Sequence, residues 1–124
     1  MAIEPDNADV RHALGLYLVR KHDYVEALDQ LRRAHELMPA NARYAYVYAI
    51  ALNSVGQTQD ALEVLKQANA QHPADFDILI ALATISRDLG DRQAAIGYAE
   101  ELVRAAPNAV QAKSLLRSLR NSSP

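Results

Sequence analysis

The chain has 124 residues, of which 50% are hydrophobic and 23% are charged, as in an ordinary globular protein. Thirteen basic and fifteen acidic residues give a net charge of -2, so no basic surplus favours a nucleic-acid partner. The absence of cysteine excludes disulfides, thiolate metal sites, cysteine nucleophiles and haem attachment through Cys-x-x-Cys-His. The longest apolar run, Tyr44 to Leu52, is less than half of the ~20 residues that a membrane helix needs. We therefore expect no membrane insertion.

Prolines recur along the chain at a fixed spacing of 34 residues. They are Pro5, Pro39, Pro73 and Pro107. Aligned on these prolines, the chain divides into three units and a partial fourth: residues 8–41, 42–75, 76–109 and 110–120. Residues in the same column of this alignment have similar size. One column holds Ala27, Ala61 and Ala95, and another holds Gly15, Ala49 and Ala83. A repeat of this length predicts stacked units, since one unit alone cannot bury its apolar faces.

Each unit predicts two helices, and the first begins after an Asn or Asp that can cap it. These capping residues are Asn7, Asn41 and Asp75. The first helix runs about thirteen residues and breaks where a turn is expected, at His22-Asp23, Gly56-Gln57 and Gly90-Asp91. No segment alternates with period two, so no strand is predicted.

The second helix of each unit is expected to end at the repeating proline, which cannot continue it. Asp23 and Asp91 are predicted to cap this helix, and Asp23 with Glu26 has the spacing of a capping box. The last segment, residues 110–120, predicts an amphipathic closing helix. Its apolar residues are Val110, Leu115, Leu116 and Leu119.

The repeated pattern of small residues, apolar residues and prolines resembles that of the tetratricopeptide repeat (TPR) family. The pattern is carried by Leu14-Gly15, Ala27, Leu31, Ala34 and Pro39, with equivalents in the next two units, over about residues 5 to 120. The Trp of the family's first helix is Arg11, Ala45 or Leu79 here, which is expected to loosen packing inside a unit. The resemblance implies an all-α, right-handed α-solenoid of antiparallel helix pairs, with about seven helices and no strands, forming a single TPR domain over residues 1–124.

The ends of the chain carry a further expectation. Residues 3–7 look like the tail of a preceding unit, so we expect a C-terminal fragment of a longer protein. Ten Arg against three Lys favours a bacterial source, and the compartment is then the cytoplasm or the periplasm.

No pattern of catalytic or ligand-binding residues occurs. The four histidines share no metal-ligand spacing, and the four glycines are isolated, so no phosphate-binding loop is formed. Glu100-Glu101 is interpreted as a solvated helix surface. We predict no enzyme, no catalytic residue, no cofactor and no metal.

In the TPR family the first helices line a concave groove that usually holds a peptide or a partner helix. The resemblance therefore implies a non-catalytic protein-protein interaction module. The groove columns carried across to this chain are His12, Leu16, Val19, Arg20, Arg43, Tyr46, Ile50, Asn53, Asp77, Ile80, Thr84 and Arg87. Leu16, Ile50 and Ile80 form its apolar centre, with a polar rim around them. The alternative is that these three are core residues, or that another part of the parent chain covers them.

One ligand class of the family is excluded by residue type. The carboxylate clamp for acidic chaperone tails needs Lys and Asn where this chain has His12 and Leu16, and Asn where it has Val47. It also needs Lys and Arg where this chain has Asp77 and Ala81. None matches, so a chaperone-tail adaptor is not expected.

The alternative function is structural. The module would pack against the rest of its parent chain, or self-associate through an exposed N-terminal helix face with Val10, Leu14 and Tyr17. A third interpretation, which rests on the resemblance, is that the module is an appendage of a larger bacterial enzyme, such as a multihaem cytochrome.

Overall fold

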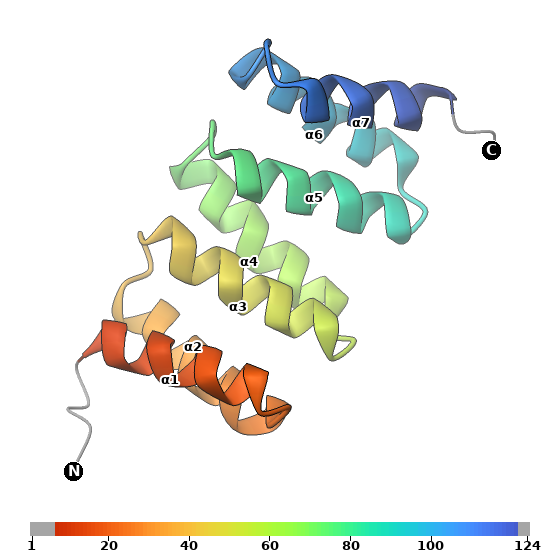
Figure 1. Ribbon diagram of the computed structural model, residues 1–124. Helices are drawn as coiled ribbons and strands as arrows, with labels where there is room; N and C mark the ends of the chain where they lie inside the picture. The colour runs from red at the N-terminus through yellow and green to blue at the C-terminus, as the bar shows by residue number, and fades with distance from the viewer. Residues whose placement is uncertain (1–6, 122–124) are drawn as a thin grey trace. The chain divides into compact units, whose positions relative to one another are not determined.

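The computed structural model describes residues 7–121, which form seven helices and no strand (Figure 1). The helices are α1 (Ala8–Arg20), α2 (Tyr24–Leu37), α3 (Ala42–Ser54), α4 (Thr58–Gln71), α5 (Phe76–Asp88), α6 (Arg92–Ala105) and α7 (Val110–Asn121). The predicted all-α arrangement of three helix pairs and a closing helix is confirmed. The predicted tail of a preceding unit lies outside the described residues, except for Asn7.

Side-chain caps determine where the first helix of each repeat begins. The Oδ1 atoms of Asn7, Asn41 and Asp75 accept hydrogen bonds from amides three residues later, at 2.9, 2.9 and 3.0 Å. These bonds satisfy amides that have no partner inside the helix. The three helices that follow have 13 residues each, as the repeat predicts.

A residue with positive φ separates the two helices of each repeat. Gly56 and Gly90 have φ of 89° and 87°, where glycine meets no steric penalty, and His22 takes the same place with φ of 61°. Asp91 caps α6 as predicted, accepting from the Ala94 amide at 3.1 Å. The predicted cap and capping box at Asp23 are wrong, because Asp23 makes no side-chain bond to the start of α2. Its φ of -96° and ψ of 72° are close to the -90° and 77° of Asp91, so the backbone conformation does not explain the difference.

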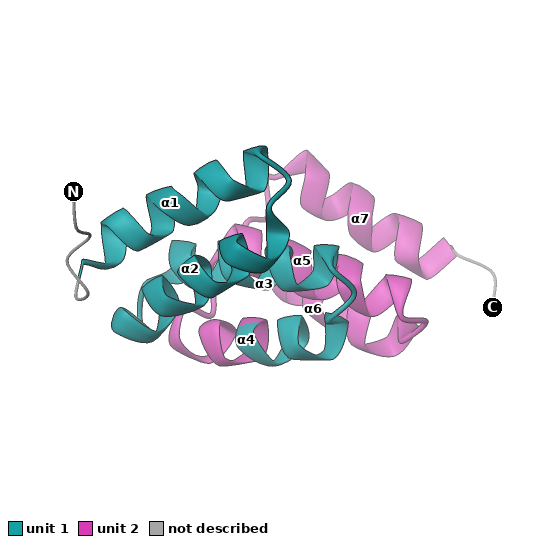
Figure 2. Ribbon diagram, turned by 90° about the horizontal axis from the view of Figure 1, so that it is seen from below, with its two compact units in different colours: residues 1–64 teal, residues 65–124 magenta. Residues whose placement is uncertain are grey.

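The structure consists of two compact units, Met1–Val64 and Leu65–Pro124, and the boundary falls inside α4 (Figure 2). In the first unit α1 packs on α2, and α2 packs on α3. In the second unit α5 packs on α6, and α6 packs on α7. A single domain over residues 1–124 stays a prediction.

A missing side chain lets α1 approach α2 closely. A Cβ atom at Gly15 would lie 2.6 Å from both Cγ and Cδ2 of Leu31, and 3.4 Å from the carbonyl oxygen of Ala27. Leu31 and Ala27 are both buried, so neither can move into solvent. The small residue at position 15 is therefore required by the packing of this helix pair.

An aromatic stack joins α1 to α3 in the first unit. The His12 ring stacks on the Tyr44 ring with centroids 4.5 Å apart and an interplanar angle of 27°. Its Nδ1 atom is buried and has no hydrogen-bond partner among the described residues. Burial lowers the pKa of His12, and the charge of Arg43 lowers it further, against a smaller opposing effect of Asp9. His12 therefore loses its proton at a lower pH than an exposed histidine does. Burial also lowers the pKa of His35.

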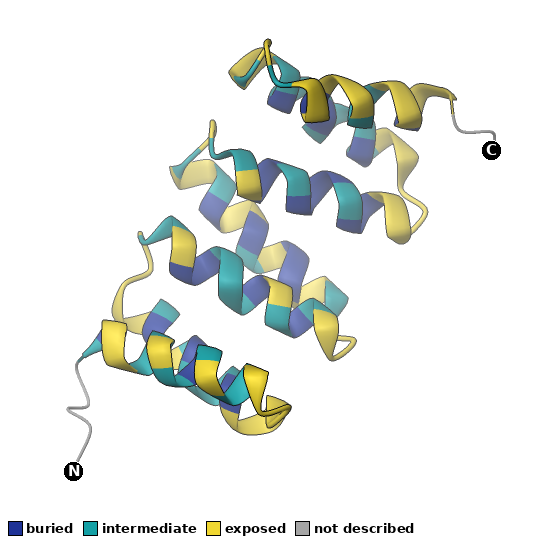
Figure 3. Cartoon of the chain, in the orientation of Figure 1, coloured by how far each residue is buried: buried dark blue, intermediate teal, exposed yellow. Residues whose placement is uncertain are grey.

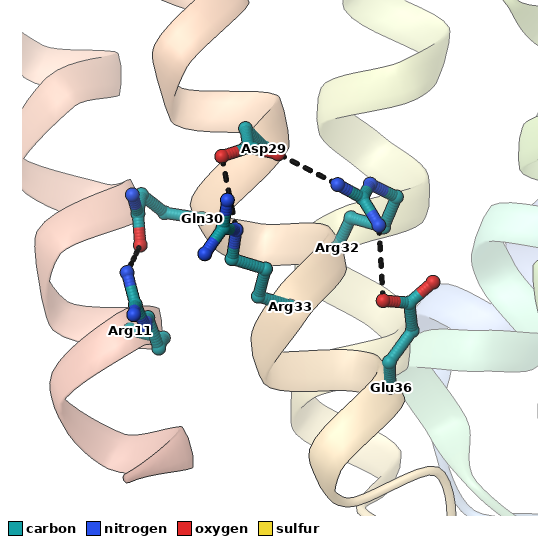
Figure 4. A network of polar contacts seen from close by, with 6 residues as sticks. All are labelled: Arg11, Asp29, Gln30, Arg32, Arg33 and Glu36. Atoms are coloured by element: carbon teal, nitrogen blue, oxygen red, sulfur yellow. Dashed lines mark hydrogen bonds and ion pairs between the residues drawn. The ribbon is translucent and has the colours of Figure 1, made fainter. Parts of the chain in front are cut away.

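The outer face of α2 carries a balanced set of charges (Figure 4). Asp29 pairs with Arg32 at 2.6 Å and with Arg33 at 3.0 Å, and Arg32 also reaches Glu36 at 3.0 Å. The hydrogen bond from Arg32 lowers the pKa of the Asp29 carboxyl. Exposed pairs of this kind contribute only about 0–1 kcal/mol each. Their effect here is to leave this surface electrically balanced.

The closing helix packs against α6 and is fixed at its end. Ala112 and Leu119 are buried, but the prediction that Val110 shares their face is wrong, since Val110 is 78% exposed. Val110 and Leu119 are nine positions apart, which places them on opposite sides of a helix with about 3.6 residues per turn. Arg92 donates from Nε and Nη2 to the carbonyl oxygens of Leu119 and Arg120, at 2.8 and 2.6 Å. These bonds satisfy carbonyl oxygens at the end of α7 that have no hydrogen-bond donor within the helix.

Two glycines inside helices give a matched test of the close crossing. Gly15→Ala should lower the free energy of unfolding, because overpacking costs about 1–3 kcal/mol while the gain in helix propensity is about 1 kcal/mol. Gly97→Ala should raise it by about 0.5–1 kcal/mol, because nothing lies within 4 Å of the added Cβ. Urea unfolding followed by circular dichroism measures both. Equal shifts in the two variants would contradict the packing role of Gly15.

The buried histidines predict how stability depends on pH. Because the pKa of His12 is lower in the fold than the ordinary value of 6.5, the unfolded chain binds the proton first. Stability is therefore complete above about pH 6.5 and falls as the pH drops below it, and His35 acts in the same direction. His12→Phe keeps the stack on Tyr44, so urea unfolding between about pH 7.5 and pH 5 should show a shallower loss of stability. An unchanged slope in His12→Phe/His35→Phe would refute this account.

Candidate functional site

An apolar pocket of about 210 Å³ lies in the first unit, between α1, α2 and α3. It is lined by Leu16, Val19, Tyr24, Leu31, Tyr46, Val47, Ile50, Ala51 and Ser54. Leu31 is fully buried, whereas the Ile50 side chain is 36% exposed and so remains accessible from solvent. Since an apolar cavity of about 150 Å³ can hold a benzene molecule, this pocket has room for one side chain of the size of Leu or Phe.

Two polar side chains of the lining already make hydrogen bonds. The Tyr24 hydroxyl lies 2.7 Å from Nδ1 of His22, and the Ser54 hydroxyl donates to the Ile50 carbonyl oxygen at 2.9 Å. The Arg43 guanidinium lies over the Tyr46 ring, 5.8 Å from its centroid, so a positive charge stands beside the pocket. What the pocket itself offers to a ligand is therefore mostly hydrocarbon.

Eight of the predicted groove residues belong to the first unit, and four of them line this pocket. These four are Leu16, Val19, Tyr46 and Ile50. His12 instead stacks on Tyr44, and the Asn53 side-chain oxygen accepts a hydrogen bond from the Thr58 hydroxyl at 2.9 Å. Arg20 and Arg43 are exposed, and Arg43 is the cation beside Tyr46. Within the first unit, the structure thus brings four apolar residues together at the pocket and leaves both predicted arginines exposed. Figure 3 shows exposed and more buried residues alternating along α1 and α3.

The other four predicted residues lie on α5, in the second unit. Ile80 is half-buried and packs against a buried cluster of Leu79, Leu102 and Ala112. The Thr84 hydroxyl donates to the Ile80 carbonyl oxygen at 2.9 Å. Asp77 is exposed, and Arg87 is exposed with Nε 3.2 Å from Asp88. The pocket lining itself comes from the first unit alone.

Five lining residues were not among the twelve predicted groove residues: Tyr24, Leu31, Val47, Ala51 and Ser54. Three of them were detectable, because Val47, Ile50, Ala51 and Ser54 follow the helical spacing of a single face. The other two come from α2, where Tyr24 is the one aromatic residue in a column that holds Thr58 and Arg92 in the other repeats. Which α2 residues reach the pocket depends on how α2 packs against its neighbouring helices. The spacing of residues along one helix does not show this.

No metal-binding cluster occurs in the described part of the chain: within residues 7–121, no three His, Asp or Glu side chains meet so that they could hold an ion. None of the helices in those residues is both long and apolar enough to cross a membrane.

Two family profiles match this chain. A profile of the tetratricopeptide repeat matches residues 52–119, and a profile of the anaphase-promoting complex, cyclosome, subunit 3 matches residues 1–68. Each match spans more than half of the 124 residues. A comparison with curated protein sequences finds no match.

Solved structures share the fold at low sequence identity. The Sgt2 TPR domain from Aspergillus fumigatus is 23% identical, with a TM-score of 0.79 over 91% of this chain and 76% of that chain. The Arabidopsis OM64 TPR domain is 19% identical, with a TM-score of 0.79 over 94% of this chain and 96% of that one. The first TPR of Spaghetti (RPAP3), solved bound to the HSP90 peptide SRMEEVD, is 19% identical, with a TM-score of 0.81 over 95% and 94%. By its repeat profile and its fold, this chain belongs to the tetratricopeptide repeat family.

Proposed function

We propose that this chain is a non-catalytic protein-protein interaction module. Its first unit accepts one large apolar side chain from a peptide or helix of a partner protein. The observation that carries this proposal is the apolar pocket of about 210 Å³, to which three helices contribute and in which Ile50 remains partly exposed. A concave apolar site with a few polar groups around it is the usual form of a ligand site.

The residues around the pocket support binding that is driven by apolar contact. Tyr46 is held under Arg43, and an aromatic residue or an arginine at such a place is a frequent hot spot. A related fold, Spaghetti (RPAP3), was solved with an HSP90 peptide. The present chain has His12, Leu16 and Val47 where a carboxylate clamp needs Lys, Asn and Asn, so its ligand differs in chemistry. Salt should then weaken binding only modestly.

The test compares two substitutions of an aliphatic residue by aspartate. Peptides selected from a random display library on the wild-type chain should share one large apolar residue. Ile50→Asp should weaken their binding at least about tenfold, because it places a charge in the pocket where the apolar side chain of the peptide would be buried. Val25→Asp is the matched control: Val25 is 83% exposed and outside the pocket lining, so its affinity should equal that of the wild type. Fluorescence anisotropy measures the three affinities.

Circular dichroism on the same variants separates loss of binding from loss of fold. Ile50→Asp should keep the helical spectrum of the wild type. If it unfolds, Ile50 is a core residue and the pocket assignment is refuted. Unchanged affinity in a folded Ile50→Asp variant would refute it as well.

Self-association through α1 is a second candidate, and two exposed side chains favour it. Val10 is 39% exposed and Tyr17 is 48% exposed. The Lys21 ammonium lies 5.5 Å from the Tyr17 ring centroid and covers part of it. Exposed apolar side chains on one helix promote association when a second copy can cover them.

Sedimentation velocity across a concentration series tests this second candidate. The wild-type chain should show a mass that rises with concentration, and Tyr17→Glu should remain monomeric, because the charge would have to be buried in the contact. Val25→Glu on α2 serves as the control and should behave as the wild type. A wild-type chain that stays monomeric at every concentration would exclude self-association.

A further inference from the structure

One side of α7 carries a row of cations and no carboxylate. Lys113, Arg117 and Arg120 follow each other at four and three residues, so they share one face of the helix. At about 1.5 Å per residue the row extends roughly 10 Å along the axis. No acidic residue occurs anywhere in α7.

The row borders a shallow groove between α6 and α7. The groove has a volume of about 310 Å³, and Val103 of α6 and Leu116 of α7 supply its aliphatic part. Lys113, Arg117 and Arg120 line it together with Asn121. The surface thus combines two half-buried aliphatic side chains with three cations, all within the second unit.

The positive charge of this surface is only partly neutralised. Arg120 pairs with Glu100 of α6 at 2.8 Å. For Lys113 and Arg117 the described part of the chain supplies no ion pair within 4.0 Å. This differs from the face of α2 in Figure 4, where Asp29 and Glu36 balance Arg32 and Arg33.

The row stands on a fixed part of the fold. Arg92 holds the end of α7 through its bonds to the carbonyl oxygens of Leu119 and Arg120. Leu119 packs in a buried cluster with Ala95 and Ala99 of α6. The backbone positions that carry the cations are therefore fixed before a partner binds, so the helix itself need not be ordered on binding.

The repeat indicates which kind of partner this surface fits. Arg117 stands in the column that holds Gly15, Ala49 and Ala83, where a small residue lets the second helix of a pair approach. An arginine there keeps a further repeat helix from packing as α2 packs on α1. A partner helix that ion pairs hold farther from α7 does not clash with the Arg117 side chain. Its carboxylates would pair with the cations if they followed each other at the same spacing of four and three residues.

We propose that α6 and α7 form a docking surface for an acidic amphipathic helix of a partner protein. Carboxylates on successive turns of that helix pair with Lys113, Arg117 and Arg120, and a leucine between them contacts Val103 and Leu116. This surface is separate from the pocket of the first unit, and it goes beyond the function proposed above.

The probe is a synthetic helical peptide of about four turns, with glutamates on three successive turns of one face and a leucine between them. A control peptide has the same composition, with the glutamates distributed around the helix. The first peptide should bind the wild-type chain at least about tenfold more tightly than the control, and its affinity should fall steeply as salt rises, because exposed ion pairs are screened. Equal affinity for both peptides, or no binding of either, would overturn the proposal.

Variants of the chain locate the contact. Lys113→Glu/Arg117→Glu should weaken binding of the first peptide at least about tenfold, and the neutral Lys113→Gln/Arg117→Gln several-fold, while circular dichroism stays unchanged. Lys21→Glu/Lys66→Glu reverses two charges outside the row and should bind as the wild type. Ile50→Asp should bind this peptide normally, so failure of the pocket and failure of this surface give different results. Equal affinity of the charge-reversed and wild-type chains would overturn the proposal, as would retention on phosphatidylserine vesicles without any binding of the peptide.

Discussion

The close approach of α1 and α2 is the contact on which the first unit depends. Gly15 has no side chain, and the space that it leaves is filled by Leu31, whose Cγ and Cδ2 would stand 2.6 Å from a Cβ there. Leu31 is also part of the lining of the apolar pocket. The same side chain therefore holds the helix pair together and forms the wall of the proposed binding site. Any substitution that moves Leu31 changes stability and pocket shape together.

The third helix completes the site because its successive side chains face different neighbours. Tyr44 turns to His12 and ties α3 to α1, while Tyr46 faces the pocket beneath Arg43. Residues two apart on a helix point in different directions, so neighbouring tyrosines serve two purposes. Burial lowers the pKa of His12, and the Arg43 guanidinium over Tyr46 places a positive charge next to the pocket.

The two candidate surfaces differ in the force that would hold a partner. The pocket of the first unit is lined mainly by aliphatic and aromatic side chains, so burial of apolar area supplies its affinity. The row on α7 is basic and exposed, so it favours an acidic partner and responds to salt. Each surface is complete within one unit. A scaffold with two such surfaces can bring two different proteins together.

The sequence by itself determined the helices and their ends. Capping residues and left-handed turn positions act on neighbouring amides, so Asn41 or Gly56 can be interpreted without knowledge of the tertiary fold. From the aligned repeats it also predicted an apolar centre at Leu16, Ile50 and Ile80. Leu16 and Ile50 line one pocket, whereas Ile80 packs on a buried cluster of the second unit. Only the tertiary structure decided that Tyr24 and Leu31 line the pocket, and that His12 stacks on Tyr44 and is not part of the lining. Those contacts join different helices, and helix packing depends on side-chain volumes at the crossing, which the spacing along a single helix does not encode.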